Sequence, residues 1–265
     1  GGMISLTKAK SKKIVWLHNP YDVYFLTKNQ FQWHQEVLYK KLLARLDAMV
    51  VLTDGDIEKY KNEIECNPIR IYNPLTLSCD KKASLEKNEL IFVGRLVYDI
   101  KGLDFLVDIM LLVKKEIPDI HLTIVGDGND RRQLEEIITK TGLSQNITMV
   151  GQTDNVASYY TEASIALLTS RKEGFGLVVT EAMECGLPVV SFKTEGPSEI
   201  IIDGENGFLI EKYDTEAFAK KIILLCNNKK MRYTMGQSAK QRASDFSISV
   251  IINEWSSLFT NLQEE

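Results

Sequence analysis

Short apolar runs alternate with amphipathic segments along most of the chain from Ile14 onward. This alternation is typical of parallel strands joined by helices that cross the sheet. In the second part of the chain the pattern predicts strands at Leu90–Val93, His121–Val125, Ile147–Val150, Ser164–Leu168, Pro188–Ser191 and Phe208–Ile210. We therefore expect an α/β fold, with a Rossmann-like parallel sheet that carries helices on both faces.

The segment between the first two of these strands has helical periodicity. We expect the helix to begin after Lys101-Gly102 and to end before Pro118. Its apolar positions recur at three- and four-residue steps and so share one face against the sheet: Leu103, Leu106, Val107, Met110 and Val113. Two further helices are predicted near the end of the chain, at Thr215–Cys226 and Ile248–Leu262.

The first part of the chain repeats the alternation over a shorter length. It predicts a strand at Lys13–Leu17, a helix at Phe31–Leu46, a strand at Ala48–Leu52, a helix from Thr53 towards Ile64 and a strand at Ile69–Tyr72. Thr53 and Asp56 have the spacing of a capping box at the start of the second helix.

Four segments follow from these elements. Residues 1–75 form a partial second Rossmann-like unit, and the polar, Lys-rich stretch 76–88 is a linker. Residues 89–245 form the larger domain, and residues 246–265 form a C-terminal helix that packs back on the N-terminal unit.

Composition removes several classes of protein. The 265 residues are 44% hydrophobic and carry a formal net charge of −4, so the chain can bury a core and is not disordered. No stretch approaches the ~20 consecutive apolar residues that a membrane-spanning helix needs. The acidic pI near 5.6 argues against binding to nucleic acid, which depends on an excess of basic residues.

The four cysteines show no metal-binding or disulfide pattern. Cys66, Cys79, Cys185 and Cys226 are scattered, without a C-x-x-C pair. We expect reduced thiols in a cytoplasmic protein, which also fits the lack of an apolar signal core near the first residues.

Loops that follow the predicted strands carry the candidate chemistry, because ligands of open α/β sheets bind beyond the carboxyl ends of the strands. Gly94-Arg95-Leu96 follows the first strand, and Lys101 precedes the next helix. Two cations beside a helix N-terminus suit a diphosphate, although a solvated pair of surface cations is an equal alternative. Gly126-Asp127-Gly128 follows the second strand and supports a dinucleotide only weakly.

The segment from Glu173 to Ala182 is the most specific feature of the sequence. Gly174 and Gly176 allow the backbone to approach a ligand closely at the start of a helix. Glu173 and Glu181 are eight positions apart, which places Glu181 about two turns into that helix, and carboxylates accept hydrogen bonds from the vicinal hydroxyls of a ribose or hexose.

Taken together, these motifs resemble the donor-binding half of a GT-B glycosyltransferase of the family-four retaining group. The match rests on Phe92–Leu96, Lys101-Gly102, Val125–Gly128, Val150-Gly151, Glu173–Glu181 and Gly196–Ile201, in the same order over Glu89 to about Asp245. A weaker resemblance covers Trp16–Asn19 and Leu46–Thr53. The first half of the family's N-terminal domain has no counterpart here, so a shortened chain, a naturally split enzyme and a fragment with a partner chain all remain open.

The resemblance implies roles for individual residues. Arg95 and Lys101 would bind the donor diphosphate, Glu181 the ribose hydroxyls and Glu173 the hydroxyls of the transferred sugar. His18 would lie near that sugar. The remaining substrate-binding positions would be Gly94, Gly126, Gly151, Gln152, Gly174, Phe175, Gly176 and Leu177. The required loop has no Asp-x-Asp motif, so we expect neither a metal nor another cofactor.

The resulting hypothesis is a retaining hexosyltransferase that uses a UDP- or GDP-sugar and a glycan, lipid-linked or other acceptor. Two alternatives remain open: a non-catalytic nucleotide-sugar-binding module that needs a partner chain, and a nucleotide-sugar epimerase of GT-B shape. An incomplete N-terminal unit would leave apolar surface uncovered, which predicts a dimer or a partner. Peripheral association with the inner face of a membrane is a further alternative. The sequence does not identify the sugar, the base or the acceptor.

Overall fold

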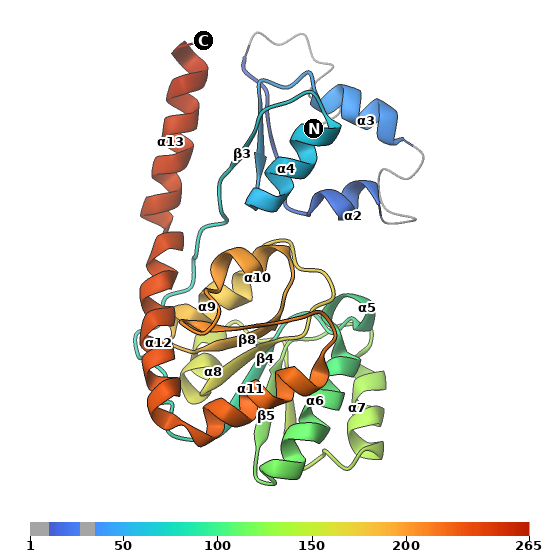
Figure 1. Cartoon of the computed structure of the whole chain (residues 1–265), viewed down its shortest axis with the longest axis vertical. Coiled ribbons are helices and arrows are strands. Elements are labelled where there is room, and N and C mark those ends of the chain that lie inside the picture. Colours follow the sequence, from blue (N-terminus) through green and yellow to red (C-terminus); the bar gives the residue numbers. More distant parts are fainter. Residues whose placement is uncertain (1–10, 27–34, 265) are drawn as a thin grey trace. The chain divides into compact units, whose positions relative to one another are not determined.

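The computed structural model describes residues 11–26 and 35–264 (Figure 1). Internal contacts divide the chain into two compact units. The N-terminal unit comprises the described residues up to Pro74, together with Glu173–Phe175 and the segment that begins at Phe246. The C-terminal unit comprises Leu75–Lys172 and Gly176–Asp245.

The C-terminal unit is built on a six-stranded sheet within the described residues. Its strands are β4 (Glu89–Val93), β5 (His121–Val125), β6 (Ile147–Gly151), β7 (Ile165–Leu168), β8 (Val189–Phe192) and β9 (Gly207–Ile210). They lie in the order β6-β5-β4-β7-β8-β9, and every neighbouring pair is parallel. This is the doubly wound order of a Rossmann-like sheet, so the predicted fold class is confirmed.

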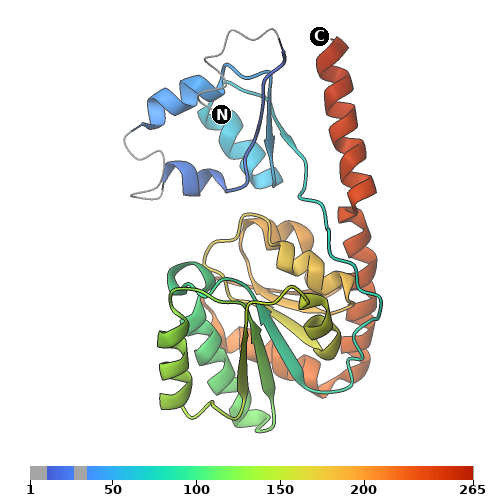
Figure 2. The ribbon, with the colours of Figure 1, turned by 180° about the vertical axis from the view of Figure 1, so that it is seen from behind.

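Helices cover both faces of this sheet, as Figures 1 and 2 show. The helices of the unit are α5 (Tyr98–Lys101), α6 (Leu103–Glu116), α7 (Arg131–Lys140), α8 (Val156–Glu162), α9 (Leu177–Glu184), α10 (Glu195–Ile200), α11 (Thr215–Asn227) and α12 (Lys229–Ala243). Helix α6 lies beside α11 on one face, whereas α8 and α9 lie on the other.

The alternation of side chains along β4 explains why both faces need cover. Leu90 and Phe92 belong to the main core, which also contains the apolar face of α6 and residues of α11. Ile91 points to the opposite face, where it lines a small space together with Tyr160 of α8 and Val179 of α9. Both kinds of position are buried, which is the signature of a central parallel strand.

The predicted strands of this unit agree with the structure within one residue at each end. The helix predicted after Gly102 is α6, and it ends at Glu116, just before Pro118. Helix α12 did not stand out from the sequence, because several of its buried positions are Arg232, Gly236 and Ala239 rather than large apolar side chains. The single-turn helix α5, which ends at Lys101, was also not predicted.

The N-terminal unit contains a small parallel sheet in the order β1-β2-β3. Its described elements are β1 (Ile14–Trp16), α2 (Tyr21–Phe25), α3 (Glu36–Leu43), β2 (Ala48–Val51), α4 (Asp54–Glu63) and β3 (Pro68–Arg70). Thr53 caps α4, because its hydroxyl accepts a hydrogen bond from the Asp56 amide at 3.1 Å. Part of the predicted helix at Phe31–Leu46 lies outside the described residues, and α3 ends three residues earlier than predicted.

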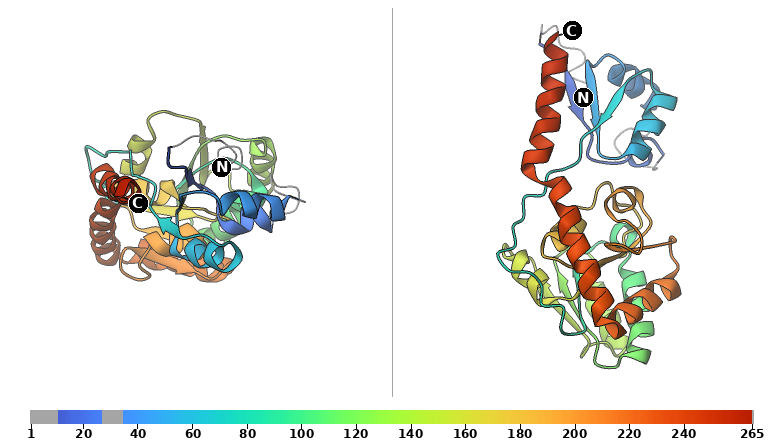
Figure 3. Two further views of the ribbon diagram at one scale, coloured as in Figure 1. Left: turned by 90° about the horizontal axis from the view of Figure 1, so that it is seen from above. Right: turned by 60° about the vertical axis from the view of Figure 1, so that its left-hand side comes forward.

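The long helix α13 (Ile248–Glu264) packs within this N-terminal unit (Figure 3). Ile251, Leu258 and Leu262 are buried against Val50 of β2 and Ile71. Their spacing of four and seven residues places them on one face of the helix. That face therefore covers one side of the small sheet.

The cysteine prediction was wrong for one pair. Cys79 and Cys185 form a disulfide, with their Cα atoms 5.3 Å apart. The segment after Pro74 runs beside the end of α9, where the amide of Ala83 donates to the carbonyl of Cys185 at 2.9 Å. The partners are 106 positions apart, so sequence spacing could not reveal them. Cys66 and Cys226 are free thiols, as expected.

Candidate active site

The loops after β4, β5 and β6 form a continuous hydrogen-bonded edge at the carboxyl ends of the strands. The amide of Gly94 donates to the carbonyl of Val125 at 3.0 Å, and that of Gly126 donates to the carbonyl of Gly151 at 2.8 Å. Leu96 and Asp127 are joined in the same way at 2.9 Å. The structure thus brings the predicted residues Gly94, Gly126 and Gly151 together.

Gly126 is required by this packing. Its φ angle is +135°, and a Cβ atom placed on it would lie 2.0 Å from the carbonyl oxygen of Gly94. A side chain at this position would therefore separate the two loops. The glycine has a structural reason that does not depend on a ligand.

Two cations lie beside this edge. Arg95 is exposed to solvent directly after Gly94. Lys101 is the last residue of α5, and a Cβ atom placed on Gly94 would lie 3.6 Å from Lys101 Cε. The Lys101 side chain therefore runs beside the glycine loop. Both cations belong to the same corner of the C-terminal unit, as the diphosphate hypothesis requires.

Glu181 lies on α9, on the opposite face of the sheet from α6. Because α9 begins at Leu177, Glu181 is just over one turn into the helix and not about two turns, as its distance from Glu173 had indicated. The hydroxyl of Tyr160 donates a hydrogen bond to Glu181 Oε2 at 3.2 Å. Burial raises the pKa of Glu181, and the hydrogen bond from Tyr160 opposes that rise.

Tyr160 is a residue that the sequence did not single out. Its side chain is buried, and its hydroxyl lies 3.3 Å from the carbonyl oxygen of Val178 as well as near Glu181. Burial and the neighbouring carboxylate raise its pKa well above the usual value. The neutral phenol is therefore a fixed donor that holds the Glu181 carboxylate in one orientation.

The start of α9 presents backbone groups. Gly176 is its N-cap, with a φ angle of +91°, and as a glycine it supplies no side-chain cap. Leu177, the first residue of the helix, is exposed. Gln152 is likewise exposed, directly after Gly151 at the end of β6. Leu177 and the Gln152 side chain are therefore exposed at the same edge of the sheet, whereas Gly176 is buried.

The other predicted residues belong to the N-terminal unit. His18 follows β1, and its ring centroid lies 4.3 Å from that of Trp16. Partial desolvation lowers the pKa of His18. Glu173, Gly174 and Phe175 group with the same unit, where the ring of Phe175 is buried between Tyr72 and Phe246. The Phe175 side chain is therefore a packing group, which leaves only its backbone for a ligand.

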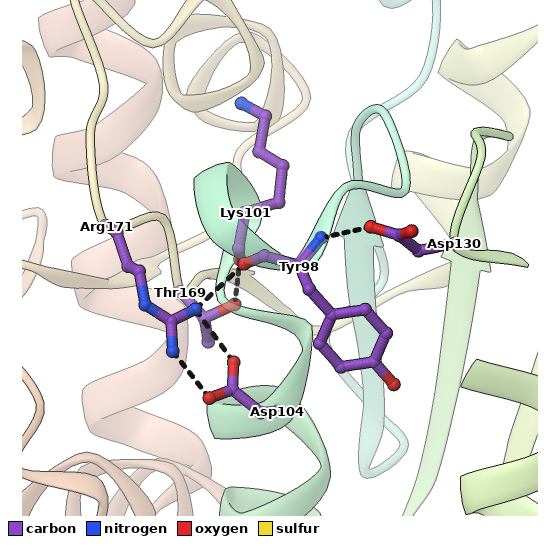
Figure 4. Close-up of polar contacts among 6 residues, drawn as sticks. All are labelled: Tyr98, Lys101, Asp104, Asp130, Thr169 and Arg171. Atoms are coloured by element: carbon purple, nitrogen blue, oxygen red, sulfur yellow. Dashed lines mark hydrogen bonds and ion pairs between the residues drawn. The ribbon is translucent and has the colours of Figure 1, made fainter. Parts of the chain in front are cut away.

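A second group that the sequence did not single out surrounds α5 (Figure 4). Arg171, which follows β7, makes a bidentate ion pair with Asp104 of α6 at 2.8 and 2.5 Å. Burial disfavours the charged form of Asp104, but the hydrogen bonds and charge of Arg171 outweigh it and keep the pKa of Asp104 below its usual value. The sequence offered one signal, because Arg171 stands two positions before Glu173.

No group of three or more His, Cys, Asp or Glu side chains in residues 11–26 and 35–264 is arranged to hold a metal ion. The same ranges contain no helix with the length and apolar character to cross a membrane. Asp127 and Asp130, the acidic residues near the β5 loop, are engaged in local contacts. Asp127 accepts from the amide of Gly128 at 2.7 Å, and Asp130 accepts from the amide of Tyr98 at 2.7 Å.

Comparison with known families decides the classification. Residues 78–242 match the family described as glycosyl transferases group 1. The chain belongs to this family. The matched residues cover β4 to α12, which is most of the C-terminal unit and includes the glycine loops, both cations and the glutamate pair. The resemblance to GT-B glycosyltransferases is thereby confirmed.

Curated relatives extend the likeness beyond the group 1 segment. An uncharacterized glycosyltransferase of Haemophilus influenzae is 32% identical over 256 residues, which cover 95% of this chain and 70% of the relative. A poly(glycerol-phosphate) alpha-glucosyltransferase of Bacillus subtilis is 32% identical over 227 residues, which cover 82% of this chain and 33% of the relative.

Solved structures share the fold. A crystal structure of TarM superimposes with a TM-score of 0.86 at 26% identity, covering 96% of this chain and 52% of TarM. A mutant of S. aureus TarM in complex with fondaparinux, alpha-GlcNAc-glycerol and UDP gives a TM-score of 0.82 at 24% identity, with the same coverage. The chain thus spans about half of the TarM chain.

Proposed function

We propose that this group 1 glycosyltransferase chain binds a UDP- or GDP-sugar at the carboxyl edge of the β4–β9 sheet and transfers its hexose with retention of configuration. The observation that carries the proposal is the corner formed by Arg95, Lys101 and the loop at Gly94. It supplies two cations and close backbone access at the end of a central strand, where ligands of such sheets bind.

The cations neutralise the donor diphosphate. Arg95 forms charge-assisted hydrogen bonds with phosphate oxygens, and Lys101 approaches from the end of α5. The first turn of α9, which begins at the exposed residue Leu177, adds the positive end of the helix dipole. This set of groups counters the negative charge without a metal ion, so the proposed reaction needs none.

Recognition of the rest of the donor follows from the remaining positions. Glu181, oriented by Tyr160, accepts hydrogen bonds from the ribose hydroxyls. Gly151 and Gln152 lie beside the base of the donor nucleotide. Glu173 and the backbone of Gly174 and Phe175 bind the transferred sugar, with His18 beside it. The four last-named residues are assigned from the motif match alone.

In the proposed reaction the bond between the anomeric carbon and the diphosphate oxygen breaks, and the electron pair leaves with the nucleotide diphosphate. Arg95 and Lys101 stabilise the charge that develops on this leaving group. The acceptor hydroxyl attacks from the same face, and its proton passes to the departing phosphate oxygen. The products are the glycoside, with its configuration retained, and the free nucleotide diphosphate.

We propose a glycan, lipid-linked or other acceptor; the Bacillus subtilis relative is named for glucosyl transfer to poly(glycerol-phosphate), which belongs to the last class. Exposed apolar residues of the N-terminal unit, such as Val37 and Leu38, favour contact with a second chain. If the chain binds donor but transfers sugar only when a partner is added, the nucleotide-sugar-binding module replaces the complete enzyme. Release of an isomerised nucleotide sugar instead of a glycoside would identify an epimerase.

Calorimetric titration with UDP and with GDP tests the proposal directly. UDP is the first ligand to use, because the S. aureus TarM crystal contains it. We expect one of the two nucleotides to bind with 1:1 stoichiometry. Absence of binding by both at millimolar concentration contradicts the proposal.

A further inference from the structure

Helix α5 cannot hold its own position. It is a single turn, Tyr98–Lys101, and an isolated turn of this length is unstable in water because nucleation fixes several dihedrals for very few hydrogen bonds. The backbone amide and carbonyl groups of this turn are instead hydrogen-bonded to other elements. At the N-terminal end, the amide of Tyr98 donates to the carboxylate of Asp130 at 2.7 Å. Asp130 stands at the start of α7.

The loop after β7 holds the other end of α5. Arg171 Nη1 donates to the carbonyl oxygen of Tyr98 at 2.8 Å. The backbone amide of Arg171 donates to the carbonyl oxygen of Ile100 at 2.8 Å. The hydroxyl of Thr169 donates to the carbonyl oxygen of Lys101 at 2.9 Å. Three of the four carbonyl oxygens of the turn are thus bound by two residues of one loop. Figure 4 shows the contacts with Tyr98 and Lys101.

The guanidinium of Arg171 is itself fixed in place. Both of its terminal nitrogens bind the carboxylate of Asp104, at 2.8 and 2.5 Å. Its carbon Cζ lies 4.2 Å from the ring centroid of Phe105. Arg171 therefore reaches α5 from a fixed position on the first turn of α6.

The backbone at the junction between α5 and α6 is tightly packed. Gly102 joins the two helices with a φ angle of +60°, and a Cβ atom placed on it would lie 2.2 Å from the carbonyl oxygen of Thr169. The residue after Lys101 is therefore pressed against the same loop that supplies Arg171. In Figure 4 the side chain of Lys101 extends away from this cluster.

We infer that Arg171, held by Asp104, is a positioning residue that fixes the turn carrying Lys101 so that the Lys101 ammonium meets the donor diphosphate. The inference rests on the proposed function. Arg171 acts through α5: its guanidinium is committed to Asp104 and to the Tyr98 carbonyl, while the flexible side chain of Lys101 makes the contact with phosphate. Loss of Arg171 then allows the backbone of Lys101 to move, and this movement weakens the contact between its ammonium group and the ligand.

The test is a double-mutant cycle on UDP affinity, measured by calorimetry with the full chain. We expect Arg171→Met to weaken UDP binding about tenfold, the scale of a lost charge-assisted hydrogen bond. In a Lys101→Met background the same change should cost less than about twofold, because the group that Arg171 positions is already gone. A matched control is Arg132→Met, which removes an exposed i,i+4 pair with Glu136 and should leave affinity unchanged.

A conservative variant separates positioning from charge. Arg171→Lys keeps the positive charge but loses the bidentate geometry, so it should bind UDP nearly as weakly as Arg171→Met. Recovery of full affinity in Arg171→Lys overturns the inference, because the residue would then act as a remote charge. An unchanged affinity in Arg171→Met, or an undiminished loss in the Lys101→Met background, overturns it equally.

Hydrogen exchange gives a reading that does not depend on the ligand. The amides of Ile100, Lys101 and Gly102 are bonded within the turn, and they should exchange faster in Arg171→Met than in Arg132→Met. If Arg171→Met does not fold, Asp104→Asn replaces it and should show the same exchange at smaller amplitude. If the unmodified chain binds neither UDP nor GDP, the proposed function fails, whereas equal exchange rates in the variants contradict the positioning role alone.

Discussion

The loops after β4 and β5 look alike in sequence but differ in what the fold asks of them. Each follows a five-residue apolar strand and opens with a glycine, Gly94 or Gly126, and the two strands are paired in register up to Val93 and Val125. The β4 loop goes on to Arg95 and Lys101. The β5 loop instead packs against the β4 loop, because Gly126 lies directly beside the carbonyl group of Gly94. A glycine at a strand end therefore has two different explanations: close packing of a neighbouring loop at Gly126, and, in our proposal, close approach of a ligand at Gly94.

The largest effect should come from the supporting loop. Gly126→Ala places a methyl group into the Gly94 carbonyl and strains a backbone with φ of +135°, so it should lower the free energy of unfolding by roughly 2–4 kcal/mol. Gly142→Ala is the matched control: its φ is +72°, but nothing lies within 4 Å of the added Cβ. Its cost should be only about 1–2 kcal/mol. Equal losses in urea denaturation would show that the two loops do not press on one another.

Arg95→Ala should show the opposite behaviour. Because Arg95 is exposed, its removal should leave the free energy of unfolding nearly unchanged while weakening UDP binding by roughly 1–3 kcal/mol. Arg132→Ala serves as the control, since 91% of that side chain is exposed and it lies in an i,i+4 pair on α7. If both variants bind UDP like the unmodified chain, the β4 loop is not the phosphate site.

Tyr160→Phe should have a smaller, pH-dependent effect. The hydrogen bond from Tyr160 lowers the pKa of Glu181 against the rise that burial causes, so its loss raises that pKa further. The ionised carboxylate is the form that accepts from two ribose hydroxyls, so UDP affinity rises as pH increases through this pKa. In titrations across acidic to neutral pH, the acidic limb should move to higher pH in Tyr160→Phe. A limb that stays in place, or moves to lower pH, contradicts the role of Glu181.

The smallest effect is expected from chelation. If Arg95, Lys101 and the start of α9 neutralise the diphosphate, EDTA should leave UDP affinity unchanged. The comparison is a titration in EDTA against one in millimolar magnesium. UDP binding that appears only with magnesium would contradict this prediction. It would show that a metal ion, rather than Arg95 and Lys101, neutralises most of the diphosphate charge.

The pattern predicted the six strands of the C-terminal unit because each is a short, largely apolar run bounded by turn residues. The motif spacing likewise predicted the loops at Gly94 and Gly176. Neither periodicity nor motif spacing could predict side-chain pairs whose members come from segments far apart in the sequence. Tyr160 is 21 positions from Glu181, and Arg171 is 67 positions from Asp104, so neither pair leaves a local pattern.

Some short helices, among them α2 and α5, were missed for a different reason. Helices α2 and α5 have five and four residues, too few to show a helical period. Helix α5 exists because Asp130, Arg171 and Thr169 bind its end groups. Its position is a tertiary property, and so is the direction from which Lys101 reaches the β4 loop.

A crystal structure of the chain with UDP tests the central claim most directly. We expect the diphosphate between Arg95, Lys101 and the first turn of α9, with the ribose hydroxyls on Glu181. Well-ordered UDP bound elsewhere on the chain, with this corner left empty, would contradict the account.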